Sequence, residues 1–439
     1  MKYKYFVRTA SRLLFSVILL VAVHTNVLAS PTELSLNDCV NLALQNNPKL
    51  GIAQAAKQQS TWDVEQAKSN SGFWLSYSHV SLRTDSPPPY WPSLAPVPTY
   101  NLFSNNLKLT VPIYTGGKLE HSIDAAKQGA RISGLGVDAT KQQLKLETAA
   151  AYFRVLQARN LLTIARQATD DFSNHLKNVQ SHYDAGTVAL SDVLQTKVKL
   201  ANAEDGFIKA QNNYDLAVYN LNNVIGLPLR YATQLKENLE YHEDLRSLDD
   251  CITFALNNRP EIAQTKARVK LAEDEVEIVR SGRKPTVGFA ASTGWKSLDF
   301  PGTDNRNWTV AMEADMDLFD SGNTKSRIEK AKAGIVVVQK QLRQMQDNIS
   351  LEVSQAYQNM KEAEKRIETS KVAVEHAALD FKLAQERYDA GVGINLDVMD
   401  AELALTQANT NYSQALYDYN TSQAQLDKAM GVRVEASGN

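Results

Sequence analysis

The sequence predicts an α+β membrane protein that is built from two tandem structural repeats. Three observations lead to this fold class. Short segments of the first half return in the second half in the same order, and long stretches rich in Ala, Gln, Glu and Lys carry apolar residues at helical spacing. Between these stretches, apolar and polar residues alternate, as they do in strands. The helical stretches are so long that we expect rods joined to a sheet instead of a globule.

Residues 1–29 have the composition of a secretory signal peptide. Four basic residues precede an apolar stretch at 13–23, and a segment ending at Ala29 suits cleavage; the basic residues are Lys2, Lys4, Arg8 and Arg12. The apolar stretch is shorter than the roughly 20 residues of a membrane-spanning helix, and no later segment is long and apolar enough to be one. We therefore expect a secreted chain in which strands would have to enter any membrane.

The charge balance argues against a nucleic acid partner. Loss of residues 1–29 changes the formal net charge from −2 to −6, whereas nucleic acid requires a basic face. The chain has two cysteines, Cys39 and Cys251, which can pair in an oxidising compartment or remain as buried free thiols. We favour packing, because each cysteine stands where an amphipathic helix needs a small buried residue.

A duplication accounts for most of the chain. Ser35–Cys39 returns as Ser247–Cys251 at a displacement of 212 residues, and Tyr183–Gly186 returns as Tyr388–Gly391 at a displacement of 205. The seven-residue difference falls in a stretch that includes the proline-rich segment 87–98, which we expect to be a surface loop. We expect a first repeat at 30–230, a linker at 231–246, a second repeat at 247–433 and a tail at 434–439.

Each repeat is expected to contain three helices. The first spans 37–68 and 249–280, with Asn37 and Asp249 as N-caps. The second, from about 124 to 183 in the first repeat, would be about 90 Å long at 1.5 Å per residue. The third spans 191–225 and 396–430 and is about 50 Å long, so that a first helix can stack end to end with a third one to match the long helix.

The long helix of the second repeat has the apolar spacing of a coiled coil. Apolar residues recur there at every seventh position, namely Val353, Met360, Ile367, Val374, Phe381 and Tyr388. In the first repeat the same spacing, at Val155, Leu162, Leu176 and Tyr183, is interrupted by Thr169. We therefore expect the second repeat to carry the more regular seam.

Two alternating stretches lie between the first and second helix of each repeat. They span about 73–83 and 106–113 in the first repeat and 286–295 and 308–318 in the second. Each is close to the roughly 9 to 11 residues that a tilted strand needs to cross an outer membrane. Four strands cannot close a barrel, so a membrane location requires an oligomer, and three chains would supply twelve strands. The alternative is a soluble sandwich with an apolar core face and a wet acidic face.

The duplicated order of elements resembles the TolC family of outer membrane factors. The resemblance covers nearly the whole mature chain and includes the prolines Pro48 and Pro260, the glycine-containing turns at 115–117 and 320–322, and the two Tyr-x-x-Gly hairpins. It implies a homotrimer with a 12-stranded β-barrel in the outer membrane, four strands per chain. A long α-helical coiled-coil barrel would continue that barrel across the periplasm.

The same resemblance implies the function of a passive outer-membrane channel in a tripartite efflux or type I secretion system. The partners would be outer membrane lipid, a periplasmic adaptor (membrane fusion) protein and an inner-membrane transporter of RND, ABC or MFS type, which supplies the energy. The alternative is a periplasmic coiled-coil scaffold or adhesin that never enters the membrane. Such a protein would have the signal peptide and the heptads but no need for four alternating strands.

The resemblance places the periplasmic entrance at the two hairpins. The entrance residues would be Asp397, Asp400, Tyr388, Ser191 and Asp192, and the adaptor would dock on Gly186, Val193, Leu194, Gly391, Val398 and Met399. On the residues alone, a glycine after a helix and an acidic residue in a first turn are ordinary caps. Asp397 and Asp400 share a helical face, and three chains would bring six carboxylates together, which favours cations.

One residue departs from the family pattern. In a well-known member a basic residue two positions after the hairpin glycine braces the closed entrance, and Gly393 stands there in this chain. We therefore expect a different or looser latch.

Acidic residues in the last predicted strand suit a channel lumen. Glu313, Asp315 and Asp317 would line the lumen if the opposite, apolar face meets lipid; the alternative is the solvated face of an ordinary strand. No arrangement of nucleophile and base is apparent. His175 and His182 are separated by about 10 Å along a helix, too far to share a metal. We expect no catalytic residue, no metal and no cofactor.

Overall fold

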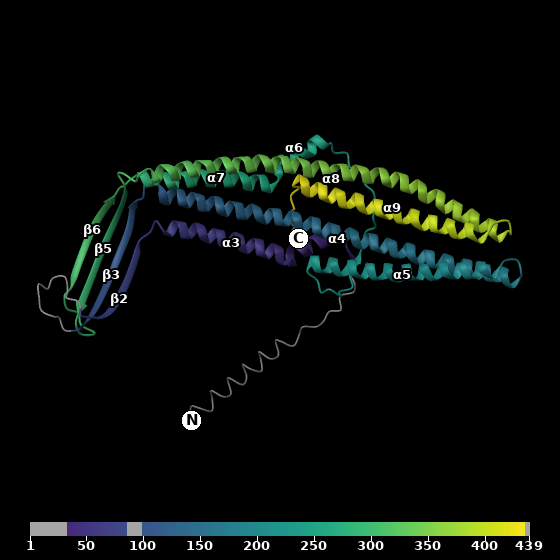
Figure 1. The fold of residues 1–439 in the computed structure, drawn as a ribbon, viewed down its shortest axis with the longest axis horizontal. Helices are drawn as coiled ribbons and strands as arrows, with labels where there is room; N and C mark the ends of the chain where they lie inside the picture. Colours follow the sequence, from purple (N-terminus) through teal and green to yellow (C-terminus); the bar gives the residue numbers. More distant parts are fainter. Residues whose placement is uncertain (1–32, 86–98, 435–439) are drawn as a thin grey trace, which may run out of the picture.

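The protein is an elongated rod with a small sheet at one end and two helical hairpins at the other (Figure 1). The computed structural model describes residues 33–85 and 99–434. The predicted signal peptide at 1–29, the proline-rich segment 87–98 and most of the predicted tail lie outside the described residues. Within the described ranges, none of the helices combines the length and the hydropathy that crossing a membrane requires.

The two repeats have the same order of elements. The first contains α2 (Leu36–Asn46), α3 (Pro48–Ser69), β2 (Trp74–Thr84), β3 (Tyr100–Tyr114), α4 (Lys118–Asp184) and α5 (Leu190–Ile225). The second contains α6 (Leu248–Asn258), α7 (Pro260–Arg280), a short 3₁₀ turn (Ser281–Arg283), β5 (Thr286–Ser297), β6 (Asn307–Asp315), α8 (Asn323–Asp389) and α9 (Asn395–Met430). A short parallel pair, β1 (Glu33–Leu34) and β4 (Gln234–Leu235), joins the start of the first repeat to the linker between the repeats.

The predicted long helices are confirmed. Both α4 and α8 span 67 residues, which corresponds to about 100 Å at 1.5 Å per residue. Each begins directly after a glycine in the left-handed conformation, Gly117 or Gly322. In the first repeat this start lies about six residues before the expected one.

The prediction of one continuous first helix per repeat was wrong. Proline lacks the amide hydrogen of a helix interior and forces the preceding residue into an extended conformation, so Pro48 and Pro260 each begin a second helix. The predicted N-caps were also two residues too late. Ser35 and Ser247 cap α2 and α6 instead, and Ser35 forms a capping box in which Asp38 accepts a hydrogen bond from the Ser35 amide at 3.0 Å.

The break at each proline also joins two helices end to end. Asn47 Nδ2 donates to the carbonyl oxygen of Val224 at 2.8 Å, near the last residue of α5. In the second repeat Arg259 Nη1 donates to the carbonyl oxygen of Ala429 at 2.9 Å, near the last residue of α9. The expected stacking of first and third helices is therefore present, and side chains at equivalent positions join the ends.

The four strands form one antiparallel sheet in the order β2-β3-β5-β6. Directly paired residues point to the same face, so the register places Leu109, Ala291 and Val310 on one face. Their neighbours Lys108, Ser292 and Thr309 lie on the other face. The predicted alternation therefore produces one apolar and one polar face.

The apolar face has no covering layer in the described part of the chain. Trp308 is 77% exposed and Met312 is 70% exposed. The described residues contain no second sheet beyond the short β1–β4 pair, which lies beside the middle of α4, where Tyr152 Oη donates to the carbonyl oxygen of Leu34. A sandwich with this face as its core is therefore not the fold.

The largest hydrophobic cluster lies where helices of both repeats meet in the middle of the rod. It includes Tyr152, Leu221, Met360 and Tyr419, together with both cysteines. Cys39 and Cys251 are buried and free, and burial raises the pKa of the Cys39 thiol to about 12. Both cysteines pack as neutral hydrophobic side chains, in agreement with the packing interpretation.

The heptad seam is regular in α8 and displaced in α4. Val353, Met360 and Ile367 are buried, as the seven-residue spacing predicts. In α4, from the turn that contains Thr169 onward, the predicted positions are not the most buried ones. The buried residues there are Ala168, Phe172, His175 and Val179, which alternate between spacings of four and three.

Candidate functional site

The two helical hairpins end together at the extremity of the rod opposite the sheet (Figure 1). We call the turns 185–189 and 390–394, with the adjoining ends of α4, α5, α8 and α9, the helical tip. Gly186 and Gly391 have φ values of 75° and 74°, a left-handed conformation that favours glycine. The amides that follow close each turn: Thr187 N donates to His182 O at 2.9 Å, and Val392 N donates to Arg387 O at 3.0 Å.

Gly393, the departure from the family pattern, is required by the turn itself. Its amide donates to the carbonyl oxygen of Arg387 at 2.9 Å. A Cβ atom at this position would lie 2.9 Å from the backbone nitrogen of Tyr388 and 3.1 Å from the carbonyl carbon of Arg387. A basic side chain therefore has no room at residue 393 in this conformation.

A small hydrophobic cluster holds the two hairpins together. Val179, Val193, Tyr388 and Val398 form its buried part, and each comes from a different helix. The ring of Tyr388 lies edge-on to two histidines of α4, with centroid distances of 5.1 Å to His175 and 5.4 Å to His182. The second hairpin thus inserts an aromatic ring into the first.

A buried polar network adjoins this cluster and centres on Asn395. Asn395 Oδ1 lies 2.7 Å from His175 Nε2 and accepts a hydrogen bond from Thr196 Oγ1 at 3.2 Å, while Asn395 Nδ2 donates to the carbonyl oxygen of Asp192 at 3.3 Å. Burial lowers the pKa of His175, so the imidazole is neutral and donates from Nε2. One amide side chain therefore links α4, α5 and α9.

A buried carboxyl group lies nearly two turns along α9 from Asn395. Glu402 is 3% exposed; its Oε1 accepts from Thr406 Oγ1 at 2.9 Å, and its Oε2 has no hydrogen-bond partner in the described part of the chain. Burial raises the pKa of Glu402 to about 7, the negative charge of Asp171 on α4 adds to the rise, and Lys199 on α5 opposes it. Burial also raises the pKa of Asp171. The interface between the hairpins thus holds two acidic side chains, and one of their oxygens, Glu402 Oε2, has no hydrogen-bond partner in the described part of the chain.

The predicted entrance residues occupy three different environments. Asp397 and Asp400 are exposed on one face of α9, and Ser191 is exposed at the start of α5. Asp192 is half-buried, and Tyr388 is buried between the hairpins. Within one chain, the structure brings Tyr388 and Asp192 to the same interface but leaves the two aspartates facing outward.

The predicted docking residues divide into surface and core. Gly186, Leu194 and Gly391 are exposed. Val193, Val398 and Met399 are buried between the hairpins, so they support the tip from inside and offer no contact surface, contrary to their expected role. The exposed apolar residues that the sequence analysis missed are Leu190, Val392, Ile394 and Leu396.

The acidic strand is shorter than expected. Glu313 pairs with Gly288 and Asp315 with Thr286, and both lie on the polar face, opposite to that of Met312. Asp317 lies beyond the end of β6 at Asp315, so its place in a lumen-facing strand was predicted wrongly. The strand ends early because its partner β5 begins at Thr286, which pairs with Asp315.

Other groups at the tip and elsewhere had no signal in the sequence. Asn395 and Glu402 have no recognisable motif, since their burial depends on helices from the other repeat. Among the described residues, one group of three side chains has the ligand types and proximity of a metal site: His121, Asp124 and Asp274. Local sequence patterns do not predict this group, because 153 residues separate His121 from Asp274.

Comparison with known sequences identifies a matching family. The family described as "Outer membrane efflux protein" matches residues 39–227 and 252–432. Outer membrane protein TolC of Escherichia coli is 23% identical over 348 residues, which cover 75% of this chain and 70% of that protein. Alkaline protease secretion protein AprF of Pseudomonas aeruginosa is 25% identical over 343 residues, which cover 77% and 71%. Cobalt-zinc-cadmium resistance protein CzcC of Cupriavidus metallidurans is 23% identical over 334 residues, which cover 75% and 77%.

Solved structures share the fold along most of the chain. The Campylobacter jejuni CmeC outer membrane channel superposes with a TM-score of 0.80 at 19% identity and covers 92% of this chain and 87% of that one. The outer membrane protein VceC of Vibrio cholerae superposes with a TM-score of 0.77 at 18% identity and covers 90% and 96%. The arrangement of sheet, rod and hairpins is therefore the fold of outer membrane channels.

Proposed function

The chain belongs to the outer membrane efflux protein family, and on that premise we propose that three copies form a channel with its entrance at the helical tip. The chain is the outer-membrane component of an efflux or secretion system, with its sheet in the membrane and its helices in the periplasm. It conducts substrates passively. The observation that carries the proposed assembly is the sheet, whose apolar face is uncovered and whose two outer strands, β2 and β6, have no partner on their free edges in the described chain.

The internal duplication indicates how the copies meet. Within the chain, β3 of the first repeat pairs with β5 of the second. The equivalent pair would be β6 of the second repeat with β2 of the first, which only a neighbouring copy can supply. Unpaired strand edges are not tolerated in hydrocarbon, so this pairing must continue until a ring closes. Three chains close it with twelve strands.

The helices support the same arrangement. Within the chain, α4 of the first repeat packs against α7 of the second. The equivalent contact, α8 against α3, is again left for a neighbouring copy. Both helices expose large apolar side chains that such a contact would cover: Ile52 and Trp62 on α3, and Val336 and Val337 on α8.

The helical tip is proposed as the periplasmic entrance. Asp397 and Asp400 are exposed on one face of α9, and within the described residues neither carboxylate forms a hydrogen bond or an ion pair. Three copies would supply six carboxylates. Such a ring attracts cations and disfavours anions.

The exposed part of the tip is proposed as the adaptor-docking surface. Gly186, Leu194 and Gly391 lie on it, together with exposed apolar residues of the second turn and of the first turns of α5 and α9. Apolar side chains that remain exposed on a periplasmic surface mark a protein contact. A periplasmic adaptor protein would bind there, and an inner-membrane transporter of RND, ABC or MFS type would supply the energy.

Fractionation and gel migration test the assembly. We expect the protein in the outer-membrane fraction, migrating as a trimer in unheated detergent samples and as a monomer after heating. A soluble monomer recovered from the periplasm would instead support a scaffold or adhesin. Conductance of the purified trimer in planar bilayers then tests whether the assembly is a channel.

A further inference from the structure

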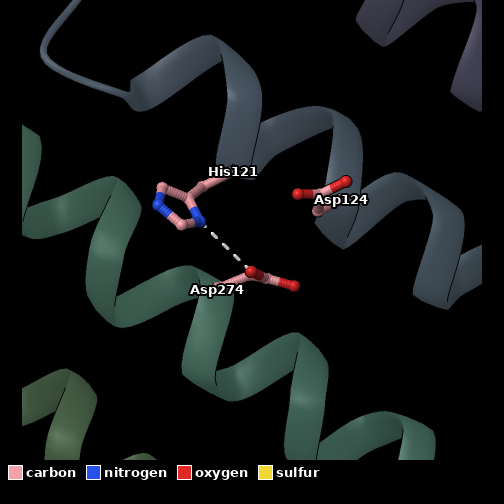
Figure 2. A group of neighbouring side chains, drawn as sticks. All are labelled: His121, Asp124 and Asp274. Atoms are coloured by element: carbon pink, nitrogen blue, oxygen red, sulfur yellow. Dashed lines mark hydrogen bonds and ion pairs between the residues drawn. The ribbon is translucent and has the colours of Figure 1, made fainter.

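Three side chains of metal-binding type converge where the first turns of α4 pack against α7, close to the sheet. Figure 2 shows His121 and Asp124 on one helix and Asp274 on the other, with the three side chains turned toward one another. One ligand atom from each lies within 4.8 Å of the others, and His121 Nδ1 is 3.2 Å from Asp274 Oδ1. The group therefore joins the first repeat to the second.

We propose that His121, Asp124 and Asp274 bind a divalent transition-metal ion of the zinc type. One imidazole nitrogen and two carboxylate oxygens form a mixed donor set that such ions accept, with water completing the coordination. The imidazole disfavours Mg²⁺ and Ca²⁺, which prefer oxygen ligands. Three protein ligands bring the ion to a fixed point between the two helices.

The surroundings suit reversible binding. The side chain of Asp274 is 20% exposed and that of His121 is 37% exposed, so the helices hold the donors in place while solvent still reaches them. Asp124 forms an ion pair with Lys127 at 2.8 Å, but both side chains are about half exposed. Exposed pairs of this kind contribute little free energy, so a divalent ion can displace the lysine.

The duplication provides an internal comparison. Residues of α4 recur in α8 205 positions later, and residues of α7 correspond to residues of α3 212 positions earlier. The counterparts of the three donors would therefore meet at the proposed contact between α8 and α3 of neighbouring copies. In the proposed assembly that contact would pair the equivalent helices but supply one donor only. The counterparts of His121, Asp124 and Asp274 are Ser326, Glu329 and Trp62. The donor set is thus specific to the joint within the chain and does not follow from the duplicated backbone.

Calorimetric titration of the full chain in detergent, untagged and freed of metal with EDTA, tests the proposal with ZnCl₂ as the probe. We expect one Zn²⁺ per chain. Loss of a residue that only supports a ligand costs roughly 10- to 100-fold in affinity, so His121→Ala and Asp274→Asn should cost at least as much. Glu329→Gln removes the carboxylate at the equivalent position of the second repeat and should leave the affinity unchanged.

Three outcomes would overturn the proposal. Equal Zn²⁺ affinity in His121→Ala and Glu329→Gln would mean that the imidazole is no ligand, and Mg²⁺ binding as tight as Zn²⁺ binding would exclude a nitrogen-dependent site. Absence of Zn²⁺ binding to the unmodified chain would mean that the three residues form no metal site. Circular dichroism identifies any variant that fails to fold, and Asp124→Asn, at a half-exposed position, then provides the second ligand variant.

Discussion

The ring of Tyr388 in α8 lies edge-on to the ring of His175 in α4, with centroids 5.1 Å apart and planes at 66°. Tyr183, the residue of the first repeat that corresponds to Tyr388, is 37% exposed, whereas Tyr388 is 4% exposed. The same Tyr-x-x-Gly hairpin therefore has two roles. Only the copy in the second repeat joins the two hairpins of one chain.

Replacing Tyr388 should loosen the tip. Tyr388→Ala removes a buried ring between His175 and His182 and should destabilise the contact between the hairpins by about 3 kcal/mol, as large-to-small substitutions of buried aromatic residues do. We expect faster amide hydrogen exchange at both turns and a larger conductance in planar bilayers. Tyr183→Ala is the matched control at the exposed copy, and equal effects of the two variants would contradict the asymmetry.

Two glycines, one in the second turn of the tip and one inside α5, should respond to alanine with opposite signs. A Cβ at Gly393 would lie 2.9 Å from the nitrogen of Tyr388, so Gly393→Ala should destabilise the turn by about 1 to 3 kcal/mol. Gly206 lies inside α5 with no atom within 4 Å of the position of a Cβ, and Gly206→Ala should stabilise the helix by about 0.5 to 1 kcal/mol. Hydrogen exchange at 387–395 and in α5 measures both changes. Unchanged exchange at 387–395 in Gly393→Ala would mean that the turn has another conformation.

The order and the type of most elements are predictable from the sequence because their signals are local. Apolar spacing distinguishes helices from strands, and the duplication identifies equivalent elements. The breaks before Pro48 and Pro260 were also readable, since proline ends a helix at the residue before it and begins the next. The early end of β6 was not, because Met316 and Leu318 continue the alternation beyond the last paired residue, Asp315.

The interior of the candidate site depends on contacts that local patterns do not contain. Tyr183 and Tyr388 occur in the same motif, and only the packing of one hairpin against the other makes them different. Glu402 is on a helix with exposed carboxylates, yet it is buried because α4 and α5 cover its face. Burial, and hence chemistry, follows from which helices meet.

Glu402 should make the stability of the tip depend on pH. Its pKa rises from an ordinary value of 4.5 to about 7 in the folded protein, because burial penalises the charged form. The Glu402 carboxyl group therefore keeps its proton to a higher pH in the folded protein than in the unfolded protein. The stability that this proton contributes is fully present below pH 4.5 and is lost as the pH rises through about 7.

The variant Glu402→Gln removes this titration. A change of this size in pKa corresponds to a free energy on the order of 3 kcal/mol, so the tip of the unmodified chain should open more readily at pH 8 than at pH 5. In Glu402→Gln this difference should disappear or reverse, because the lowered pKa of buried His175 makes the folded tip less stable at acidic pH. Hydrogen exchange of α9 amides at several pH values, corrected for intrinsic rates, measures it. Glu204→Gln, at an exposed position on α5, should retain the difference, and the hypothesis fails if Glu402→Gln retains it too.

The two exposed aspartates of α9 should determine ion preference. Asp397 and Asp400 share one face, and in the proposed trimer they place six carboxylates around one opening. Asp397→Ala combined with Asp400→Ala should shift the reversal potential in a KCl gradient toward that of a non-selective pore. Glu375→Ala removes an exposed carboxylate of α8 away from the turns and should leave the reversal potential as it is. Unchanged selectivity in the double variant would place the selective region elsewhere. The polar face of the sheet, with Glu313 and Asp315, would then be the next region to test.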